Sequence, residues 1–305
     1  MQSVEEAGTR LRKALFGNPN EKEKEVLEIV INNDLQTRLS ISQYYEAVYG
    51  TPLQEDLKVK LNPHFRNLVM DLFLSPVDYD VLQLKNSFKG FSIDEGVIFE
   101  ILTSRPKEML DEIKKLYKEQ NGKEIRQEIE KNFGNPFKKN LTTLLNTERN
   151  VNPNPDKNQC EKDAELLYNT AESNWISDEI FGNIFAKKSP EELVLIGRYY
   201  YKKTGVTLID TIEKKMSGKI KTFFRELLYN VIIPAELFAE KIYEAIKGLG
   251  TNTTVLNRVL ATRNEIDMTQ IRELYKWKYK VDMKEDIMGD TSGNYQNLCV
   301  YLGEK

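Results

Sequence analysis

One short pattern recurs four times along the chain, and this repetition limits the fold more than any other feature of the sequence. A tyrosine within an apolar-periodic segment is followed five residues later by glycine in three copies and by lysine in the fourth. A short amphipathic segment and then an apolar segment follow each copy. Repetition of this kind indicates a chain built from several similar modules. The four pairs are Tyr45 with Gly50, Tyr117 with Gly122, Tyr200 with Gly205, and Tyr275 with Lys280.

The loops that open these units set the length of the repeat, which is about seventy residues with one longer gap. They centre on Gly17, Gly90, Asn174 and Gly248. The excess length lies in residues 151–159, where two prolines interrupt helix and indicate a linker. We therefore expect four repeats joined by this linker, with bounds at 3–74, 75–150, 160–233 and 234–305.

Within each unit, apolar residues recur with a helical period. Leu110, Ile113, Leu116 and Tyr117 are an example, since they share one face of a helix. Signals for β-strands are nearly absent. The pattern predicts an all-α protein with about five helices in each repeat.

The fourth unit carries the most specific candidate site, formed by the segment Lys-Gly-Leu-Gly-Thr at 247–251 and by Asp290, which lies 42 positions after Gly248. Glycines adopt backbone angles that let successive carbonyl oxygens turn toward one point, and a helix end leaves carbonyls unpaired. A distant carboxylate can close the cage, and such hard oxygen ligands suit calcium. For the loop alone, a glycine helix cap beside an unrelated aspartate is the favoured interpretation.

With these features the whole chain resembles the annexin family. The fourth repeat matches best, and the second matches through Lys89 to Glu95 and through Thr103-Ser104-Arg105, whereas the first and third match mainly in order and spacing. The resemblance is to a divergent member, and the giardins of flagellate protists are a comparable branch. It implies an all-α fold of four repeats arranged as a slightly curved disc, with the loops between the first and second helices facing a membrane.

The resemblance favours calcium over a simple glycine cap in the fourth repeat, because Asp290 lies at the spacing expected of the family. It also implies a ligand set for the ion. The main-chain carbonyls of Ile246, Gly248 and Gly250 would bind the ion, and Asp290 would bind it through both carboxylate oxygens. Water or a lipid phosphate would fill the remaining positions, because calcium accepts roughly six to eight oxygens. Lys247, in the same loop, is an expected lipid contact.

The second repeat departs from this pattern. Counting the same 42 positions from Gly90 reaches Asn132, whose neutral side chain offers one oxygen. Asp94 and Glu95 keep the acidic pair that forms secondary calcium sites in annexins. An equally weighted interpretation is that both are favourable charges in the first turn of a helix.

The first and third repeats have lysines, Lys60 and Lys215, at the position of the calcium-binding carboxylate. A lysine opposes calcium, so we expect no full site in either repeat. These lysines could instead contact lipid phosphates directly. Annexins hold membranes through several calcium bridges that reinforce one another, so a chain with one full site needs high calcium or self-association of several protomers on the membrane.

Trp175 lies in the loop of the third repeat, where some annexins place an exposed tryptophan that enters the lipid interface. Tryptophan prefers such interfaces, which makes Trp175 a candidate lipid contact. The other interpretation is that Trp175 packs against its own repeat. The sequence leaves both open.

Composition argues against other classes of function. The chain has 44 basic and 47 acidic residues and a net charge of −3, so no global attraction draws it to nucleic acid. The single histidine, His64, cannot form a zinc cluster, and no nucleophile or phosphate-loop motif is present, so we expect no enzyme.

Cys160 and Cys299 are too few for a disulfide framework. Without a signal peptide or a long apolar run, a cytoplasmic protein at a membrane surface or on the cytoskeleton is expected.

Three functions follow from these observations. The leading hypothesis is a calcium-dependent phospholipid-binding protein that attaches to anionic membranes mainly through its fourth repeat. The alternative is a structural scaffold that binds a cytoskeletal protein and retains calcium binding only as a vestige. A channel ranks last, because it depends on family resemblance of the pairs Asp80 with Arg105 and Glu240 with Arg263, for which capping of helix ends is favoured.

Overall fold

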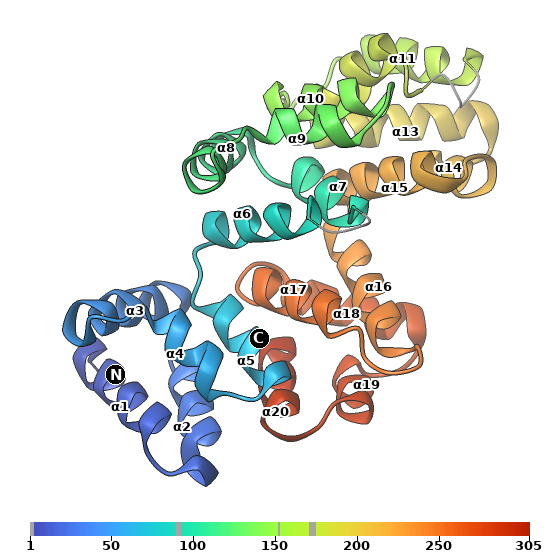
Figure 1. Ribbon diagram of the computed structural model, residues 1–305. Coiled ribbons are helices and arrows are strands. Elements are labelled where there is room, and N and C mark those ends of the chain that lie inside the picture. Colours follow the sequence, from blue (N-terminus) through green and yellow to red (C-terminus); the bar gives the residue numbers. More distant parts are fainter. Residues whose placement is uncertain (1–2, 90–92, 152, 171–174) are drawn as a thin grey trace. The chain divides into compact units, whose positions relative to one another are not determined.

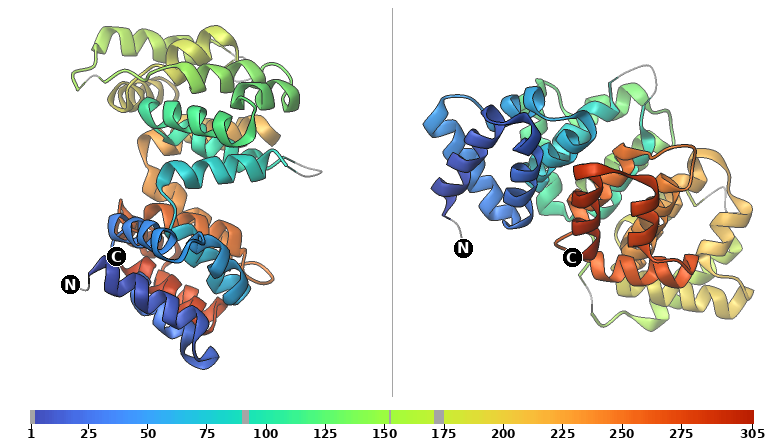
Figure 2. Two further views of the ribbon diagram at one scale, coloured as in Figure 1. Left: turned by 60° about the vertical axis from the view of Figure 1, so that its left-hand side comes forward. Right: turned by 90° about the horizontal axis from the view of Figure 1, so that it is seen from below.

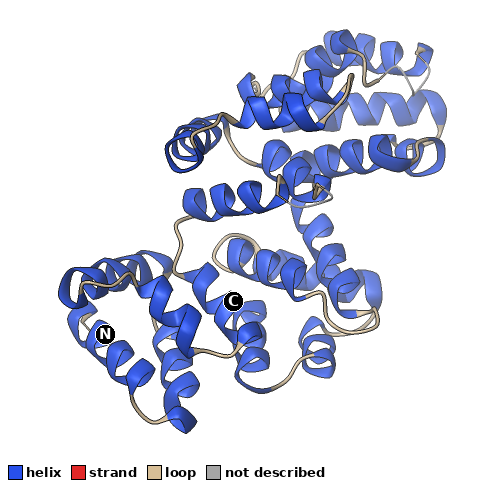
Figure 3. Cartoon of the chain, viewed as in Figure 1, coloured by secondary structure: helices blue, strands red, loops and turns tan. Residues whose placement is uncertain are grey.

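A computed structural model describes residues 3–89, 93–151, 153–170 and 175–305 of the chain. Within these ranges every regular element is a helix, and Figure 3 shows helices joined by short loops. The prediction of an all-α fold is confirmed.

The helices fall into four sets that follow the repeats of the sequence. The first set comprises α1 (Val4–Phe16), α2 (Pro19–Ile31), α3 (Leu35–Tyr49), α4 (Leu53–Lys60) and α5 (Pro63–Leu72). The second comprises α6 (Pro76–Ser87), α7 (Glu95–Ser104), α8 (Lys107–Asn121), α9 (Ile125–Asn132) and α10 (Phe137–Asn146). The third comprises α11 (Lys157–Asn169), α12 (Asp178–Ile180) continued by the π-helix η2 (Phe181–Ala186), α13 (Pro190–Thr204), α14 (Leu208–Lys215) and α15 (Gly218–Ile232). The fourth comprises α16 (Pro234–Ile246), α17 (Thr253–Arg263), α18 (Met268–Tyr279), α19 (Met283–Asp290) and α20 (Gly293–Glu304).

The recurring tyrosine pattern marks the end of the third helix of each set. Gly50, Gly122 and Gly205 cap these helices with left-handed φ angles of 67°, 66° and 73°. Glycine adopts this conformation without a Cβ clash, which explains its place in the pattern. Lys280 takes the same conformation, with φ 62°, at the end of α18. The geometry of the cap is therefore kept where the glycine is missing.

The chain forms two compact units. Unit 1 contains the residues up to Tyr79 together with Ala235–Lys305, and unit 2 contains Asp80–Pro234. The first and fourth helix sets thus share one core, although they lie at opposite ends of the sequence. In unit 1, α1 lies beside α2 and α3 (Figures 1 and 2), and α5 packs on α17. In unit 2, α7 packs on α15 and α11 on α13.

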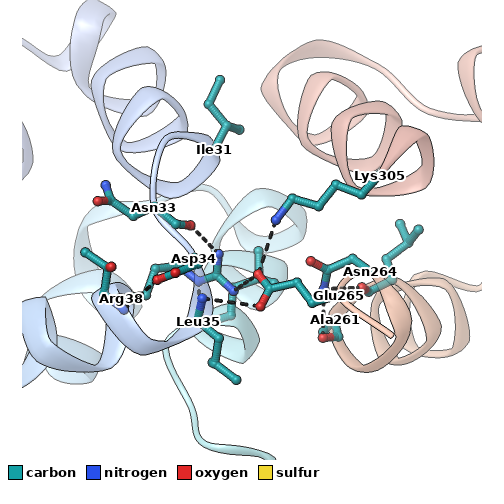
Figure 4. A network of polar contacts seen from close by, with 12 residues as sticks. Ile31, Asn33, Asp34, Leu35, Arg38, Ala261, Asn264, Glu265 and Lys305 are labelled. Carbon is teal, nitrogen blue, oxygen red and sulfur yellow. Dashed lines mark hydrogen bonds and ion pairs between the residues drawn. The ribbon is translucent and has the colours of Figure 1, made fainter. Parts of the chain in front are cut away.

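A buried polar network joins the first and fourth sets inside unit 1 (Figure 4). The Arg38 guanidinium is 2% exposed and donates to the main-chain oxygens of Leu72, at 2.8 Å, and Asn33, at 2.6 Å. It also contacts the Glu265 carboxylate at 3.3 Å, and Lys305 reaches the same carboxylate at 3.2 Å. Burial lowers the pKa of Arg38 below its ordinary value. Such a network is costly to break at Arg38, because the carbonyls that its buried guanidinium binds would lose their donor.

Asp71, near the end of α5, makes the stability of the protein depend on pH. Burial raises the pKa of its carboxyl to about 7. Between the unfolded pKa of about 3.9 and this value, the folded state holds a proton that the unfolded state releases, so stability falls as the pH rises through this window. We expect Asp71→Asn to be more stable than the parent, and its advantage to grow by roughly 2–3 kcal/mol between pH 5 and pH 8.

Urea unfolding at the two pH values measures this difference. Glu119→Gln, on the exposed face of α8, is the control, and its stability relative to the parent should not change with pH. An advantage of Asp71→Asn that is the same at both pH values would contradict the assignment.

Candidate functional site

The fourth helix of each set ends at the position for which the sequence predicts a calcium ligand or its replacement. Helices α4, α9, α14 and α19 are all eight residues long. Their last residues are Lys60, Asn132, Lys215 and Asp290. The structure therefore places these four side chains at equivalent points, and only Asp290 carries a carboxylate there.

In the fourth repeat, the loop after α16 is a turn fixed by a left-handed glycine and a main-chain hydrogen bond. Gly250 has φ 79°, a conformation that favours glycine. The loop is closed where the Asn252 amide donates to the Ala245 carbonyl at 2.7 Å, and the Asn252 side chain then caps α17. Leu249, at the tip, is fully exposed. The loop thus projects from the helices with its backbone at the surface.

Thr251 joins this loop to Asp290. Its hydroxyl lies 2.7 Å from Asp290 Oδ2 and 2.8 Å from the Asp290 main-chain oxygen. The structure therefore brings together the loop and the carboxylate that the sequence separates by 42 positions. The sequence pattern assigns no such role to Thr251, and the only signal for it is its place at the end of the Lys-Gly-Leu-Gly-Thr segment.

A second contact anchors the start of the loop. The Lys247 ammonium lies 2.7 Å from Asp286 Oδ1, and the Tyr275 hydroxyl donates to Asp286 Oδ2 at 2.6 Å. The hydrogen bond with Asp286 is the main reason that the pKa of Lys247 is raised. The repeated tyrosine thus holds an aspartate that in turn holds Lys247. The charge of Lys247 is partly neutralised inside the site.

The fourth repeat offers oxygens of the kind that calcium binds. Main-chain carbonyls at Ile246, Gly248 and Gly250 belong to the turn that Gly250 makes possible, and Thr251 keeps the Asp290 carboxylate next to it. Calcium takes such hard oxygen ligands. In the part of the chain that the structure describes, no group of three or more His, Cys, Asp or Glu side chains could hold a metal ion. A calcium site in the fourth repeat would draw instead on the backbone and on one carboxylate.

In the second repeat the loop closes in the same way, but its acidic residues are engaged. The Asp94 amide donates to the Ser87 carbonyl at 3.2 Å, with the same sequence spacing as Asn252 to Ala245. The Asp94 side chain caps α7, and Glu95 forms an ion pair with Lys219. The alternative of favourable charge in the first turn of a helix fits Glu95, which lies in the first turn of α7, whereas Asp94 precedes that turn as the N-cap. Gly90, at the centre of this loop, lies outside the described residues.

In the first repeat the loop is much shorter. One residue, Gly17, separates α1 from the capping Asn18, whereas five residues separate α16 from Asn252. The Lys60 ammonium lies 4.4 Å from the centroid of the Phe16 ring, so it faces this loop as Asp290 faces its own. A lysine and a short loop occupy the place of the glycine turn and the carboxylate.

In the third repeat, Trp175 is fully buried, which agrees with the interpretation that it packs against its own repeat and contradicts a contact with lipid. Its indole nitrogen donates to the Leu167 carbonyl at 3.2 Å, and its ring packs against Phe185, Tyr200 and Phe224. Aromatic rings from three helices make this site more favourable than water for the indole. Asn174, at the centre of the expected loop, lies outside the described residues.

Of the two charge pairs that the family resemblance suggested, the structure contains Asp80 with Arg105, whereas Glu240 and Arg263 bind other residues. Asp80 and Arg105 form a bidentate pair inside unit 2, with distances of 2.6 and 2.9 Å. In the fourth repeat Arg263 binds Asp267 at 2.8 Å, and Glu240 accepts from Lys278 at 3.2 Å. Each pair ties neighbouring helices together.

Comparisons with known proteins agree on one family. The model of the annexin family matches residues 79–144, 162–227 and 237–302. Human annexin A13 is 30% identical over 98% of this chain and 95% of its own length, and bovine annexin A3 is 34% identical over 94% and 88%. The solved structure of annexin III superposes with a TM-score of 0.91 at 29% identity, covering 99% of this chain and 94% of the other. Calcium-bound alpha-14 giardin, at 19% identity and a TM-score of 0.84, shares the fold.

No helix in the described ranges is both long and apolar enough to cross a membrane.

Proposed function

Because this chain belongs to the annexin family, we propose that it attaches to anionic phospholipid membranes in a calcium-dependent manner, mainly through its fourth repeat. The observation that carries the proposal is the contact of Thr251 with Asp290, which holds a carboxylate beside a glycine turn. The second repeat has a loop of the same closure but lacks the carboxylate, since Asn132 takes its place.

The residues of the fourth repeat have distinct parts in this attachment. The carbonyls of Ile246, Gly248 and Gly250 and the carboxylate of Asp290 would hold calcium. When bound, calcium supplies the positive charge that allows a lipid phosphate to approach Asp290. Thr251 orients Asp290, and the Lys247–Asp286 pair holds the first residue of the loop.

Leu249 adds an apolar contact. Its side chain is fully exposed at the tip of the loop and does not contribute to the buried core. A leucine that enters the boundary between headgroups and acyl chains gains the free energy of leaving water. We expect Leu249→Ala to weaken calcium-dependent vesicle binding by roughly 10- to 50-fold, since it removes three carbon groups, each worth ~0.8 kcal/mol when it leaves water completely.

The matched control is Ile266→Ala, which removes an exposed apolar side chain, 68% accessible, from the turn between α17 and α18. This variant should bind vesicles like the parent. Equal affinity of Leu249→Ala and the parent would show that the loop tip stays outside the lipid.

Co-sedimentation with phosphatidylserine vesicles across a calcium titration tests the proposed function itself. We expect calcium to bring the protein into the pellet, a chelator to release it, and phosphatidylcholine vesicles to bind much less. Absence of pelleting at every calcium concentration would reject the function and turn attention to a protein partner, such as a component of the cytoskeleton.

A further inference from the structure

The end of α4 in the first repeat gathers four cationic side chains. Lys58 and Lys60 belong to its last turn. The Lys22 ammonium donates to the Lys60 carbonyl at 3.2 Å, and the Arg66 guanidinium donates to the Lys58 carbonyl at 3.1 Å. The carboxyl end of a helix is negative, so it stabilises cations at this point. We refer to Lys22, Lys58, Lys60 and Arg66 as the basic end of α4.

The fourth repeat shows what this cluster replaces. Arg66 is the fourth residue of α5, and Gln296 is the fourth residue of α20. Gln296 donates to the Met288 carbonyl at 2.8 Å, and Met288 is the sixth residue of α19, as Lys58 is of α4. The same backbone bond is therefore made by a neutral amide in one repeat and by a cation in the other. The last residues of the two helices show the same trend, since Lys60 of the first repeat is positive where Asp290 of the fourth is negative.

Two apolar side chains flank the basic end of α4. Val59 is 77% exposed and Phe16 is 48% exposed, and the Lys60 ammonium lies over the Phe16 ring. Glu23, which follows Lys22 in α2, accepts from the main-chain amide of Asn62 at 3.0 Å and from the Asn294 side chain at 3.4 Å. Cations beside exposed apolar groups suit a surface that is anionic outside and apolar beneath.

We propose that the basic end of α4, with Phe16 and Val59, binds the anionic headgroups of a phospholipid membrane directly, without calcium. The lysines supply at the first repeat the positive charge that a metal ion would supply at the fourth. The exposed Phe16 and Val59 favour a membrane over a free phosphate, because a small hydrated anion offers no apolar surface with which they could pack. The proposal shares with the proposed function only the membrane as partner.

The test is co-sedimentation with phosphatidylserine vesicles in the presence of a chelator, at low and at physiological ionic strength. We expect measurable binding by the parent at low salt that declines as salt screens the charges. Lys58→Glu with Lys60→Glu should reduce this binding by more than about tenfold, since each basic residue near an anionic surface contributes ~1 kcal/mol. The control, Lys115→Glu with Lys162→Glu, has the same change in charge on α8 and α11, far from α4 in sequence, and should bind like the parent.

Further variants separate this contact from the calcium site. Lys60→Arg keeps the charge and should retain binding, which distinguishes a charge effect from a defect in folding. Asp290→Ala should not weaken the calcium-free binding even if it abolishes the calcium-dependent part, because it removes a negative charge that repels the anionic surface. Two results would overturn the proposal: no calcium-free binding of the parent to vesicles, or equal binding by the parent and by Lys58→Glu with Lys60→Glu.

Discussion

Replacement of Asp290 by alanine is expected to raise the calcium concentration needed for half-maximal vesicle binding by on the order of 100-fold or more. Loss of groups that only orient a metal ligand already costs roughly 10–100-fold in metal affinity, and Asp290 is the carboxylate that Thr251 holds beside the glycine turn. The side chain ends a helix and is partly exposed, so its removal leaves no buried cavity. Calcium-dependent co-sedimentation measures the effect.

Asn132→Ala is the matched control, because Asn132 ends α9 as Asp290 ends α19. Asn132→Ala should need the same calcium concentration as the parent for half-maximal vesicle binding. Thr251→Val should fall between the two, since it leaves the carboxylate in place but removes the hydroxyl that holds it. If Asp290→Ala needed no more calcium than the parent for half-maximal vesicle binding, the fourth repeat would not be the attachment site.

Replacement of Arg38 by alanine is expected to lower the free energy of unfolding by about 3 kcal/mol. The substitution leaves the carbonyls of Leu72 and Asn33 without their charged donor and takes one cation from Glu265. Loss of the donor is costly because these buried carbonyls stay away from water. Because the network joins the first and fourth repeats, the effect should appear in the unfolding of unit 1.

Arg10→Ala is the control for this experiment. Arg10 and Glu25 lie 2.7 Å apart, closer than Arg38 and Glu265, but both side chains are 41% exposed. Water screens such a pair, so its loss should cost less than about 1 kcal/mol. Urea unfolding followed by circular dichroism, with calorimetry to resolve the two units, compares the variants. Equal losses for both would mean that burial does not determine the strength of these contacts.

Much of the fold could be predicted from the sequence because it depends on local periodicity. The tyrosine pattern located the third helix of each repeat, since a left-handed cap favours glycine at that point. The 42-residue spacing located Asp290 at the end of α19, since equal repeats place equal positions at equal points. These features follow from the sequence alone and needed no knowledge of which helices pack together.

The partners of the side chains could not be predicted in this way. Trp175 stands in a polar loop, and only the rings of Phe185, Tyr200 and Phe224 explain its burial. In the same way, nothing near Lys60 in the sequence indicates that Lys22 lies against its carbonyl. These contacts depend on how helices far apart in the chain approach one another.

The sequence by itself therefore determined the helical class, the four repeats and the one repeat in which a carboxylate stands opposite a glycine turn. Only the tertiary structure decided that the first and fourth repeats share a core, that Arg38 ties them through Glu265, and that the end of α4 is surrounded by cations. The physical reason is the range of the interactions. Helix periods and caps act over a few residues, whereas burial and charge pairing act through space between segments that the chain keeps far apart.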